Sequence, residues 1–481
     1  MDFRSIAKFL SVIGMVLGLF FLLDLGVGLL YGEAVGRFAL FDLVFVLGNL
    51  GMWLLLRRHP FRLGIRESIL SVNLLWLLIG VAGAVPLWLM TEVSPASALF
   101  EAISGFTTTG ATVYGDIESL PHLILFHRSL MHWLGGMGII VLGVGLLSMI
   151  NPSGSLSLFK AESTGVQMEK LTPKIRDTAL RLWGIYLALT LADALLLYLL
   201  GMSVFDAVNH AFSTISTGGF STKNASMGAF DGSSAILWVT TLFMILSGVN
   251  FLAHLKLFYR DGSGYRTEEV RWYLGLFVLL SSVLAAVHFA GSGDGLWFSA
   301  THAFFTIASV MTTTGFATLD YAQWGHLAIA VVLIAMVLGG NAGSTAGGIK
   351  VIRHVIIFKT LAAEMKRLMH PSAMISVFID GVRMKERLLF STFGFFLLYV
   401  LTTFATMLYI YLRGFDEMTA FSGALALVGN IGPGFSMVGP ADNFGFFTDA
   451  DKLVFSAVMV VGRLECYTVF VLFTASFWKR F

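Results

Sequence analysis

Ten long apolar segments dominate this sequence and constrain its fold more than any other feature. They cover residues 5–30, 38–56, 67–90, 124–149, 178–201, 234–258, 272–290, 324–340 with a continuation beyond it, 388–412 and 453–476. A helix needs about 20 predominantly apolar residues to cross the hydrocarbon core of a membrane. Charged residues make up only 12% of the chain, whereas about 25% is usual in a soluble domain. The sequence therefore predicts an all-α polytopic membrane protein and disfavours a soluble enzyme, a disordered scaffold and a secreted disulfide protein.

Charge and cysteine content exclude further classes. The net charge of +2 offers no basic excess for binding nucleic acid. The single cysteine, Cys466, leaves no possibility of an intrachain disulfide. Residues 343–348 look like a phosphate-binding loop, but Ile349 stands where that motif requires a lysine, and Lys350 comes one position too late. We find no nucleophile–base pair, metal cluster or phosphate cradle, so we expect no enzymatic activity and no cofactor.

The basic residues determine the expected orientation of the helices. If ten spans are counted, 25 of the 31 lysines and arginines lie on one side, and the connections on the other side are rich in Asp and Glu. Because cytoplasmic loops carry an excess of Lys and Arg, we expect both termini in the cytosol. The basic residues in question are Arg4, Lys8, Arg57, Arg58, Arg62, Arg66, Lys160, Lys170, Lys174, Arg176, Arg181, Lys256, Arg260, Arg266, Arg271, Lys350, Arg353, Lys359, Lys366, Arg367, Arg383, Lys385, Arg387, Lys479 and Arg480.

Four of the outer connections share a pattern rich in Ser, Thr and Gly. They read FTTTGA at 106–111, ISTGGF at 215–220, TTTGF at 312–316 and GNIGPGF at 429–435. Each contains a reference glycine, and these glycines are 108, 97 and 117 residues apart: Gly110, Gly218, Gly315 and Gly432. Such near-regular spacing indicates an internal repeat.

Each of these loops is preceded by a short helical run, such as 96–106 or 205–213, that cannot span a membrane. The expected unit is a spanning helix, a re-entrant half-helix, a glycine-containing loop and a second spanning helix. We expect an N-terminal hairpin of two transmembrane helices at 1–60. Four such units would follow around one central pore, at 61–160, 161–262, 263–372 and 373–481.

Loops of this kind suit a cation pathway. Non-helical backbone at membrane depth is tolerated only where it is buried in protein or lines a wet cavity. Glycine permits positive φ angles, which let successive carbonyls point the same way. Four such loops around an axis would form a ring of oxygen ligands that replaces the hydration shell of a cation. The alternative is that they are ordinary surface turns.

At these residues the sequence resembles the Trk/Ktr/HKT superfamily of potassium transporters. The most specific stretches are SGFTTTG at 104–110, the run at 339–350 and GRLE at 462–465. The N-terminal hairpin makes the chain most similar to the Trk-type membrane subunit, and the resemblance covers essentially the whole chain. It implies a homodimer with one pore of fourfold pseudosymmetry per subunit, in the bacterial cytoplasmic (inner) membrane. It also implies a cytosolic ring of nucleotide-binding regulatory subunits.

The family pattern assigns K⁺ binding to the backbone of three residues in each loop. Members with serine in place of the first filter glycine tend to favour Na⁺, so Gly110 favours K⁺ here. The fourth loop departs from the Thr-rich pattern. The filter residues are Thr108, Thr109, Gly110, Ser216, Thr217, Gly218, Thr313, Thr314, Gly315, Asn430, Ile431 and Gly432.

A glycine-rich stretch interrupts the eighth apolar segment. The resemblance implies an intramembrane gating loop below the filter, whereas the simpler alternative is a static helix kink. Its residues are Gly339, Gly340, Asn341, Ala342, Gly343, Ser344, Thr345, Ala346, Gly347 and Gly348. Arg463 lies within the last span, where insertion costs at least about 2.5–3.5 kcal/mol, so it should face a wet cavity or a partner. The resemblance places it below the filter, as a barrier to cations; a structural ion pair is the alternative.

Two alternative functions remain open at this stage. One is a symporter that couples K⁺ to H⁺ or Na⁺, and the other is a nonconducting scaffold for regulatory subunits. We interpret His132 as part of a glycine-rich helix-packing motif, because no second metal ligand has suitable spacing. The roles of Asp24, Asp193 and Glu465 stay open.

Overall fold

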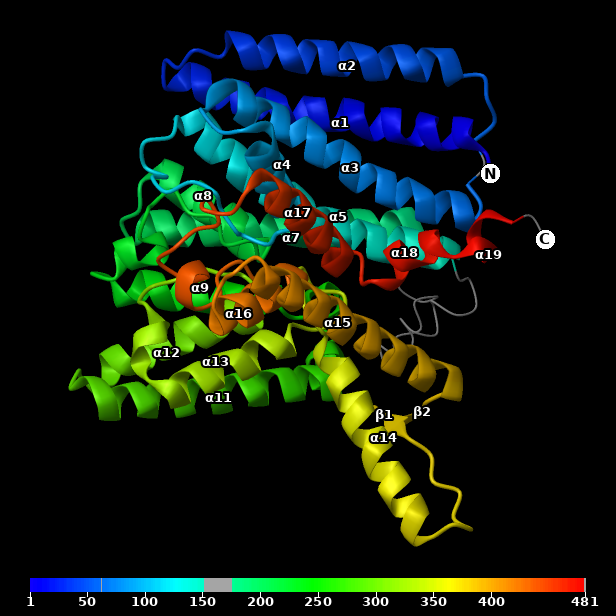
Figure 1. The fold of residues 1–481 in the computed structure, drawn as a ribbon, viewed down its shortest axis with the longest axis vertical. Coiled ribbons are helices and arrows are strands. Elements are labelled where there is room, and N and C mark those ends of the chain that lie inside the picture. The colour runs from blue at the N-terminus through cyan, green and yellow to red at the C-terminus, as the bar shows by residue number, and fades with distance from the viewer. Residues whose placement is uncertain (62, 151–174, 480–481) are drawn as a thin grey trace.

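The protein is predominantly helical, with most helices running roughly side by side (Figure 1). The computed structural model describes residues 1–61, 63–150 and 175–479, and only the backbone at 139–150 and 175–176. The predicted repeat boundary at 160/161 lies outside the described residues, as do Arg62, Lys160, Lys170, Lys174 and Arg480. Within them, the only sheet is an antiparallel hairpin of β1 (Phe378–Ile379) and β2 (Val382–Arg383).

Two helices at the edge of the molecule form an N-terminal hairpin. They are α1 (Phe3–Leu30) and α2 (Gly36–Leu56), which lie side by side in Figure 1. The side chain of Asp2 caps α1 by accepting from the backbone N–H groups of Arg4 and Ser5. A hydrogen bond from His59 holds the pKa of Asp2 below its usual range. Only α1 packs extensively on the rest of the chain, because most side chains of α2 are exposed and apolar.

Four helical units follow the hairpin in chain order. The first contains α3 (Ile65–Met90), α4 (Pro95–Phe106) and α5 (His122–Ile150). The second contains α7 (Ile175–Leu199), α8 (Val204–Ile215), α9 (Ser234–Ser247) and α10 (Phe251–Phe258). The third contains α11 (Glu268–Ser292), α12 (Leu296–Met311), α13 (His326–Leu338) and α14 (Val351–Met369). The fourth contains α15 (Glu386–Leu412), α16 (Glu417–Val428), α17 (Asp449–Arg463) and α18 (Tyr467–Phe470).

Short 3-10 helices and one terminal α-helix complete the described chain. They are η2 (Ser226–Phe230), η3 (Gly262–Arg266), η4 (Tyr321–Trp324), η5 (Ser436–Val438), η6 (Val471–Phe473) and α19 (Ala475–Trp478).

The second helix of each unit is too short to cross a membrane. Helices α4, α8 and α16 have 12 residues each and α12 has 16. At a rise of about 1.5 Å per residue they span roughly 18–24 Å, less than the ~30 Å of a hydrocarbon core. Three of them start at a side-chain cap, provided by Ser94, Ser203 and Asp416. Each therefore ends inside the protein, where its loop begins.

Two segments expected to be continuous spans are broken. Helices α9 and α10 meet at 98°, and α17 meets α18 with η6 at 110°. Asn250 caps α10, and Glu465 and Cys466 take positive φ angles of 57° and 54° after α17, so neither helix can continue straight. The prediction of single helices at 234–258 and 453–476 is therefore wrong. Helix α13 ends at Leu338 after 13 residues, where the glycine-rich stretch begins.

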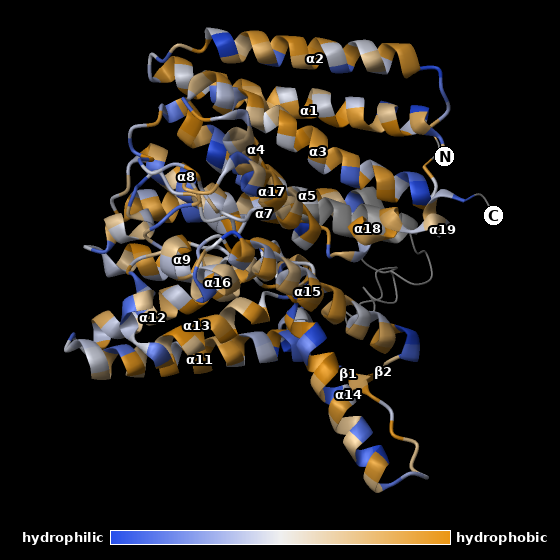
Figure 2. Ribbon diagram, in the orientation of Figure 1, coloured by the Kyte–Doolittle hydropathy of each residue, from blue (hydrophilic) through white to orange (hydrophobic). Residues whose placement is uncertain are grey.

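Length and hydropathy identify candidate membrane spans among the described residues. Among the described residues, six helices are long and apolar enough to cross a membrane, and the two bent pairs raise this to at most eight. Helix α5 has 29 residues, although its side chains from 139 onward are not described. Figure 2 shows hydrophilic residues near helix ends and along α14, and hydrophobic residues along α2 and α15. These features describe a multi-pass membrane protein.

Both termini lie at the same end of the molecule (Figure 1). Arg66, at the start of α3, donates to the carbonyl of Lys479 near the C-terminus. Lys8 in α1 donates to the carbonyl of His59 at 2.8 Å. Helix α14 projects beyond the other helices at this end (Figure 1). The short helices α4, α8, α12 and α16 start at the opposite end.

Candidate ion pathway

The four loops that follow the short helices share one backbone conformation. Each places a non-glycine residue at positive φ and, two residues later, a glycine at positive φ. The first positions are Thr108 (53°), Thr217 (54°), Thr313 (58°) and Asn430 (54°). The second positions are Gly110 (79°), Gly219 (87°), Gly315 (83°) and Gly432 (95°). Such angles are rare for residues other than glycine, so their fourfold recurrence identifies structurally equivalent loops.

The hydrogen bonds that close the short helices give the same equivalence. In each loop a backbone N–H reaches back five residues, at 2.8–2.9 Å, from Thr109 to Ser104, Gly218 to Ser213, Thr314 to Ser309 and Ile431 to Ala426. Gly218 is therefore equivalent to Thr109, and Gly219 to Gly110. The sequence alignment that paired Gly218 with Gly110 is one residue out of register. Two consecutive glycines caused the error, because only the backbone distinguishes them.

The four equivalent glycines pack against one another's loops in a closed cycle. A Cβ atom at Gly110 would lie 2.2 Å from the carbonyl oxygen of Gly218. A Cβ atom on Gly219 would lie 2.0 Å from the carbonyl oxygen of Thr314, and one on Gly315 would lie 2.1 Å from that of Ile431. A Cβ atom on Gly432 would lie 2.6 Å from the carbonyl oxygen of Thr109. Each loop thus touches the next, and the fourth touches the first. The loops form a ring in which a side chain larger than hydrogen does not fit.

Carbonyl oxygens of this ring remain available to a ligand. No hydrogen bond within the described chain ends on the carbonyl oxygens of Thr109, Thr314 or Ile431. Most threonine hydroxyls here are paired, Thr107 with Thr109 and Thr312 with Thr314, both at 2.7 Å; that of Thr108 is buried and has no partner among the described residues. Backbone oxygens, which attract cations, are therefore the groups that the ring can offer.

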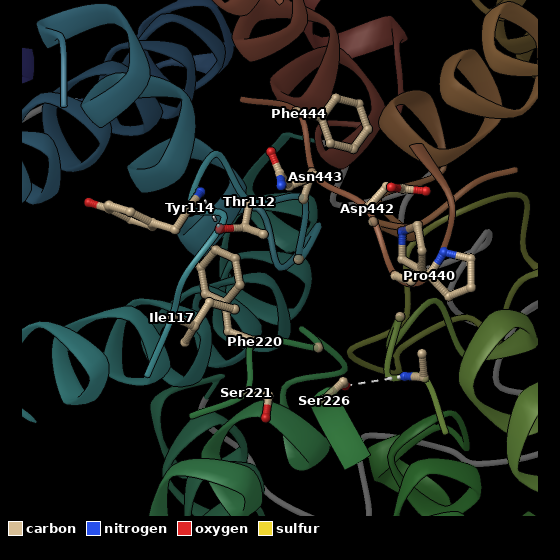
Figure 3. A pocket seen from close by; sticks show the side chains of 18 of the residues that line it. Thr112, Tyr114, Ile117, Phe220, Ser221, Ser226, Pro440, Asp442, Asn443 and Phe444 are labelled. Atoms are coloured by element: carbon tan, nitrogen blue, oxygen red, sulfur yellow. Dashed lines mark hydrogen bonds between the residues drawn. The ribbon is translucent and has the colours of Figure 1, made fainter. Parts of the chain in front are cut away.

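A cavity of about 90 Å³ lies over the ring. All four ring glycines line it, together with residues that follow them in their loops. Figure 3 shows Thr112 and Tyr114 from the first unit, Phe220 and Ser221 from the second, and Asp442 from the fourth gathered around it. More of the exposed lining is polar than apolar, as suits an ion that enters with its water.

The loops of the first two units are joined beside this cavity. Asn224 donates to the carboxylate of Asp116 at 2.9 Å and accepts from the N–H of Ile117 at 2.6 Å. The hydrogen bond from Asn224 also holds the pKa of Asp116 below its usual range. Asp116 therefore stays ionised at neutral pH at the end of the molecule where the short helices start.

A buried ion pair connects α4 and α5 to the loops of the first two units. Arg128 in α5 donates to Glu101 in α4 at 2.8 Å, and the pair is almost fully buried. The second carboxylate oxygen of Glu101 accepts from the N–H of Val113 at 2.8 Å. Arg128 also donates to the carbonyl of Ser221 at 3.3 Å and lies over the Phe220 ring, with its guanidinium carbon 4.0 Å from the ring centroid. Sequence reasoning missed this pair, although two charges within apolar segments were a visible signal.

The glycine-rich stretch lies directly against the loops of the ring. The N–H of Gly347 donates to the hydroxyl of Thr313 at 2.6 Å. A Cβ atom at Gly347 would lie 2.4 Å from the carbonyl oxygen of Gly429. The hydroxyl of Thr345 donates to the carbonyl of Ile215, at the end of α8, at 3.0 Å. The glycine-rich stretch therefore contacts the second, third and fourth units.

The bends in the chain hold this stretch in place. The N–H of Asn341 donates to the carbonyl of Gly248 at 2.9 Å, and the N–H of Phe251 to that of Gly343 at 3.0 Å. Both partners belong to the break between α9 and α10. The side-chain amide of Asn341 is fully buried and has no partner among the described residues. These two backbone hydrogen bonds attach the stretch to the second unit.

Arg463 contacts the glycine-rich stretch. It is 3% exposed, and its Nη1 donates to the carbonyl of Thr345 at 2.9 Å. Its Nε and Nη2 atoms have no hydrogen-bond partner within the part of the chain that the structure describes. Glu465 pairs instead with Arg353 of α14 at 2.6 Å. No carboxylate among the described residues forms an ion pair with Arg463, so the described structure does not support the alternative of a structural ion pair.

Two other candidate residues, His132 and Asp193, are fully buried. His132 donates to the carbonyl of Gly105 at 2.6 Å and stacks on Phe220, with ring centroids 4.1 Å apart, as expected for a packing motif. Asp193 lies in α7. No group of three or more His, Cys, Asp or Glu side chains gathers within the described ranges.

Comparison with known protein families gives one match that covers most of the chain. A model for the family TrkH, described as a cation transport protein, matches residues 37–287 and 297–480. Among curated proteins, the Trk system potassium uptake protein TrkH of Salmonella typhimurium is 38% identical over 495 residues, and the match covers 100% of both chains. The Trk system potassium uptake protein TrkG of Escherichia coli is 37% identical over 449 residues, covering 92% of this chain and 91% of its own.

A solved structure shares the fold. The crystal structure of the potassium transporter TrkH from Vibrio parahaemolyticus matches with a TM-score of 0.90 and 36% identity, and 100% of each chain is covered.

Proposed function

Because the chain belongs to the TrkH family of cation transport proteins, we propose that it takes up K⁺ through a channel-like pore whose filter is the ring of four loops. The observation that carries this proposal is the closed cycle of glycine–carbonyl contacts from Gly110 to Gly432. The relatives are named as transport proteins, and none of those reported above is named as an enzyme. K⁺ is the transported ion, and no cofactor is needed for its passage.

The ring provides the chemistry that a dehydrated K⁺ ion needs. Backbone carbonyl oxygens replace water in its shell, and the C-terminal ends of four short helices add partial negative charge. Thr108, Thr109 and Gly110 supply the first loop, and the one-residue shift makes Thr217, Gly218 and Gly219 their equivalents in the second. Ser216 accordingly lies one position before the second filter segment.

Selectivity tests the filter assignment. We expect Gly110→Ser to lower the preference for K⁺ over Na⁺, because its side chain would meet the Gly218 carbonyl and displace a ring oxygen. Relative K⁺ and Na⁺ uptake by a transport-deficient host measures this. The matched control is Gly115→Ser, in the same loop, where a Cβ has only one neighbour, at 3.7 Å. Unchanged relative uptake in a well-expressed Gly110→Ser variant would count against the filter.

The glycine-rich stretch 339–348 is proposed as the gate, with Arg463 as a positive barrier beside it. Its hydrogen bonds to Thr313 and Arg463 support a closed position below the ring. Opening would require the N–H of Gly347 to leave the Thr313 hydroxyl. The small residues of the stretch would make such a movement inexpensive.

The assembly and orientation follow from family membership and charge. We propose a homodimer in the bacterial cytoplasmic membrane, with both termini in the cytosol. A cytosolic ring of nucleotide-binding subunits would control the gate from the end that carries α14, because α14 follows the stretch directly after Lys350. The chain then divides into the hairpin 1–60 and four pore repeats.

Transport by purified protein decides between the possible mechanisms. In liposomes with opposed K⁺ and H⁺ or Na⁺ gradients, a passive pore gives a reversal potential set by the K⁺ gradient alone. A reversal potential that also depends on H⁺ or Na⁺ would instead establish a symporter. Absence of K⁺ and Rb⁺ flux, with and without the regulatory subunit, would leave the scaffold role.

A further inference from the structure

A carboxyl–imidazole pair is buried between the N-terminal hairpin and the first pore unit. Asp24 of α1 and His127 of α5 are both fully buried, and their Oδ2 and Nδ1 atoms are 2.8 Å apart. The aromatic rings of Phe21 and Phe38 cover the imidazole, with centroids at 5.2 and 5.6 Å. The other Asp24 oxygen has no hydrogen-bond partner among the described residues. Ionisable groups placed within a membrane are costly and commonly functional.

The hydrogen bonds of His127 require a shared proton. Its Nε2 lies 3.1 Å from the carbonyl oxygen of Gly83, which can only accept, so Nε2 carries hydrogen. A neutral imidazole then has a lone pair on Nδ1, and an ionised Asp24 also offers only lone pairs. The 2.8 Å contact is therefore a hydrogen bond only if one proton lies between the two groups. That proton belongs either to the carboxyl group or to the imidazolium.

The pair lies close to one end of the helices that hold it. Leu30 ends α1 six residues after Asp24, a rise of about 9 Å. His122 starts α5 five residues before His127, a rise of about 8 Å. A second carboxyl–imidazole contact lies at that end, where Glu33 and His122 are 3.2 Å apart and His122 is 46% exposed. The pair therefore lies nearer to this end of α1 and α5 than to the other.

Few other charged groups face the pair. On α2, Asp42 packs against α1 beside Gly18, where a Cβ would lie 3.1 Å from its Oδ1. Arg128 follows His127 on α5 but is paired with Glu101 of α4. On α3, the charged residues Arg66 and Glu67 belong to the opposite end of the helix. Besides the pair itself, the charged and histidine residues on α1 to α5 and the turn after α1 are Arg4, Lys8, Glu33, Arg37, Asp42, Arg66, Glu67, Glu101, His122, Arg128 and His132.

The pair is linked to the first filter loop through Gly83. A Cβ atom at Gly83 would lie 2.7 Å from Phe106, the last residue of α4, and 2.7 Å from Met131 of α5. Thr108 follows Phe106 by two residues. The carbonyl that His127 holds thus belongs to the part of α3 on which the end of α4 packs. A change at His127 therefore acts on the helix end that presents the filter.

We propose that Asp24 and His127 form a proton-binding site through which the N-terminal hairpin adjusts the first filter loop to the pH on the side where α5 begins. Its effect on transport rests on the proposed function. When the proton leaves for bulk water, Asp24 becomes a carboxylate that faces the Nδ1 lone pair. Two acceptors at 2.8 Å repel each other, so His127 turns and releases Gly83. The proton binds to a regulatory site and is not carried across the membrane.

The variant Asp24→Asn tests the site because its amide can donate permanently to Nδ1. This substitution has nearly the shape of the protonated carboxyl group and keeps both bonds of His127 without an exchangeable proton. The matched control is Asp42→Asn, which changes the neighbouring carboxyl on α2. In full-length protein labelled with ¹⁵N-histidine, we expect the His127 resonance to change with pH in the native chain and in Asp42→Asn. It should stay constant in Asp24→Asn, and its loss in His127→Gln assigns it.

Flux measurements test the consequence. In liposomes, Rb⁺ influx through the native protein should fall about fivefold as the pH rises on the side where α5 begins, at the lower end of typical allosteric coupling. Asp24→Asn should keep the high influx at every pH, and His127→Gln the low influx. A native pH profile in Asp24→Asn, or a His127 resonance that does not change with pH in the native chain, would overturn the proposal. If the native protein carries no Rb⁺ at any pH, the transport function fails, and the resonance alone decides the proton site.

Discussion

At the scale of single residues, the four ring glycines meet two requirements that other residues do not. Their φ angles lie between 79° and 95°. A Cβ atom added to any of them would lie too close to the carbonyl oxygen of a neighbouring loop. The equivalent residues of the second loop were misjudged by one position because both candidates are glycine. Backbone hydrogen bonds, which no side-chain pattern encodes here, assign Gly219 to the ring.

Gly219→Ala should abolish Rb⁺ uptake while the protein still reaches the membrane. An alanine at φ 87° is strained, and its Cβ would meet the Thr314 oxygen at 2.0 Å, so the ring must open at the junction of the second and third loops. Uptake by a transport-deficient host, normalised to protein in the membrane, measures the effect. The control Gly232→Ala, which meets nothing within 4 Å, should behave like the native chain. Native uptake by Gly219→Ala would contradict the ring.

Arg463→Ala should increase leak through the closed pore. The change removes a buried positive charge and the bond from Nη1 to the Thr345 carbonyl, so both the barrier and one attachment of the gate are lost. Rb⁺ efflux from liposomes without the regulatory subunit measures leak. Arg463→Lys keeps the charge and should restore most of the barrier. Unchanged efflux in a well-folded Arg463→Ala variant would remove Arg463 from the gate.

At the scale of elements, the ion pair between α4 and α5 fixes the ends of two loops. Glu101→Gln leaves Arg128 buried without its counter-charge, which should cost about 3–5 kcal/mol of stability. The double variant Glu101→Gln/Arg128→Met removes both charges and should regain much of this loss. Thermal unfolding in detergent, followed by fluorescence-detected size exclusion, compares them. Equal stability of the native and Glu101→Gln proteins would show that the pair is not needed to hold these elements.

The elements themselves could be predicted from the sequence to different degrees. Apolar segments located the hairpin and the first helix of each unit, because a membrane requires long apolar helices whatever their tertiary contacts. The helix breaks at Asn250 and Glu465 could not be predicted from the sequence, because the residues on both sides of each break are apolar. A tertiary contact explains the break at Asn250: the N–H of Phe251 donates to the carbonyl of Gly343 in the glycine-rich stretch. The Glu101–Arg128 pair required knowledge of which helices are neighbours.

At the scale of the whole molecule, the chain combines a ring at its centre with asymmetric attachments around it. Among the four units, the glycine-rich stretch interrupts only the third, and it contacts the second at Ile215 and Gly248 and the fourth at Gly429. The hairpin of α1 and α2 contacts the first unit through its buried pair and the Glu33 contact to α5, and Tyr31 of the hairpin also packs against Phe205 of the second unit. The glycine-rich stretch and the hairpin can therefore act on the fourfold ring separately, from two opposite ends of the molecule.

The orientation in the membrane can be tested because the sequence has a single cysteine, Cys466, which is fully buried. In a Cys466→Ser background, Asp294→Cys reports the end where the short helices start, and His370→Cys reports the end that carries α14. Both residues are exposed. If ten spans are counted, 25 of the 31 lysines and arginines fall on the same side as Lys350 and Arg353, so the end that carries α14 should face the cytosol. A membrane-impermeant maleimide should therefore label Asp294→Cys in intact cells and His370→Cys only after permeabilisation. The reverse pattern would place the cavity over the ring in the cytosol and exclude the proposed route of uptake.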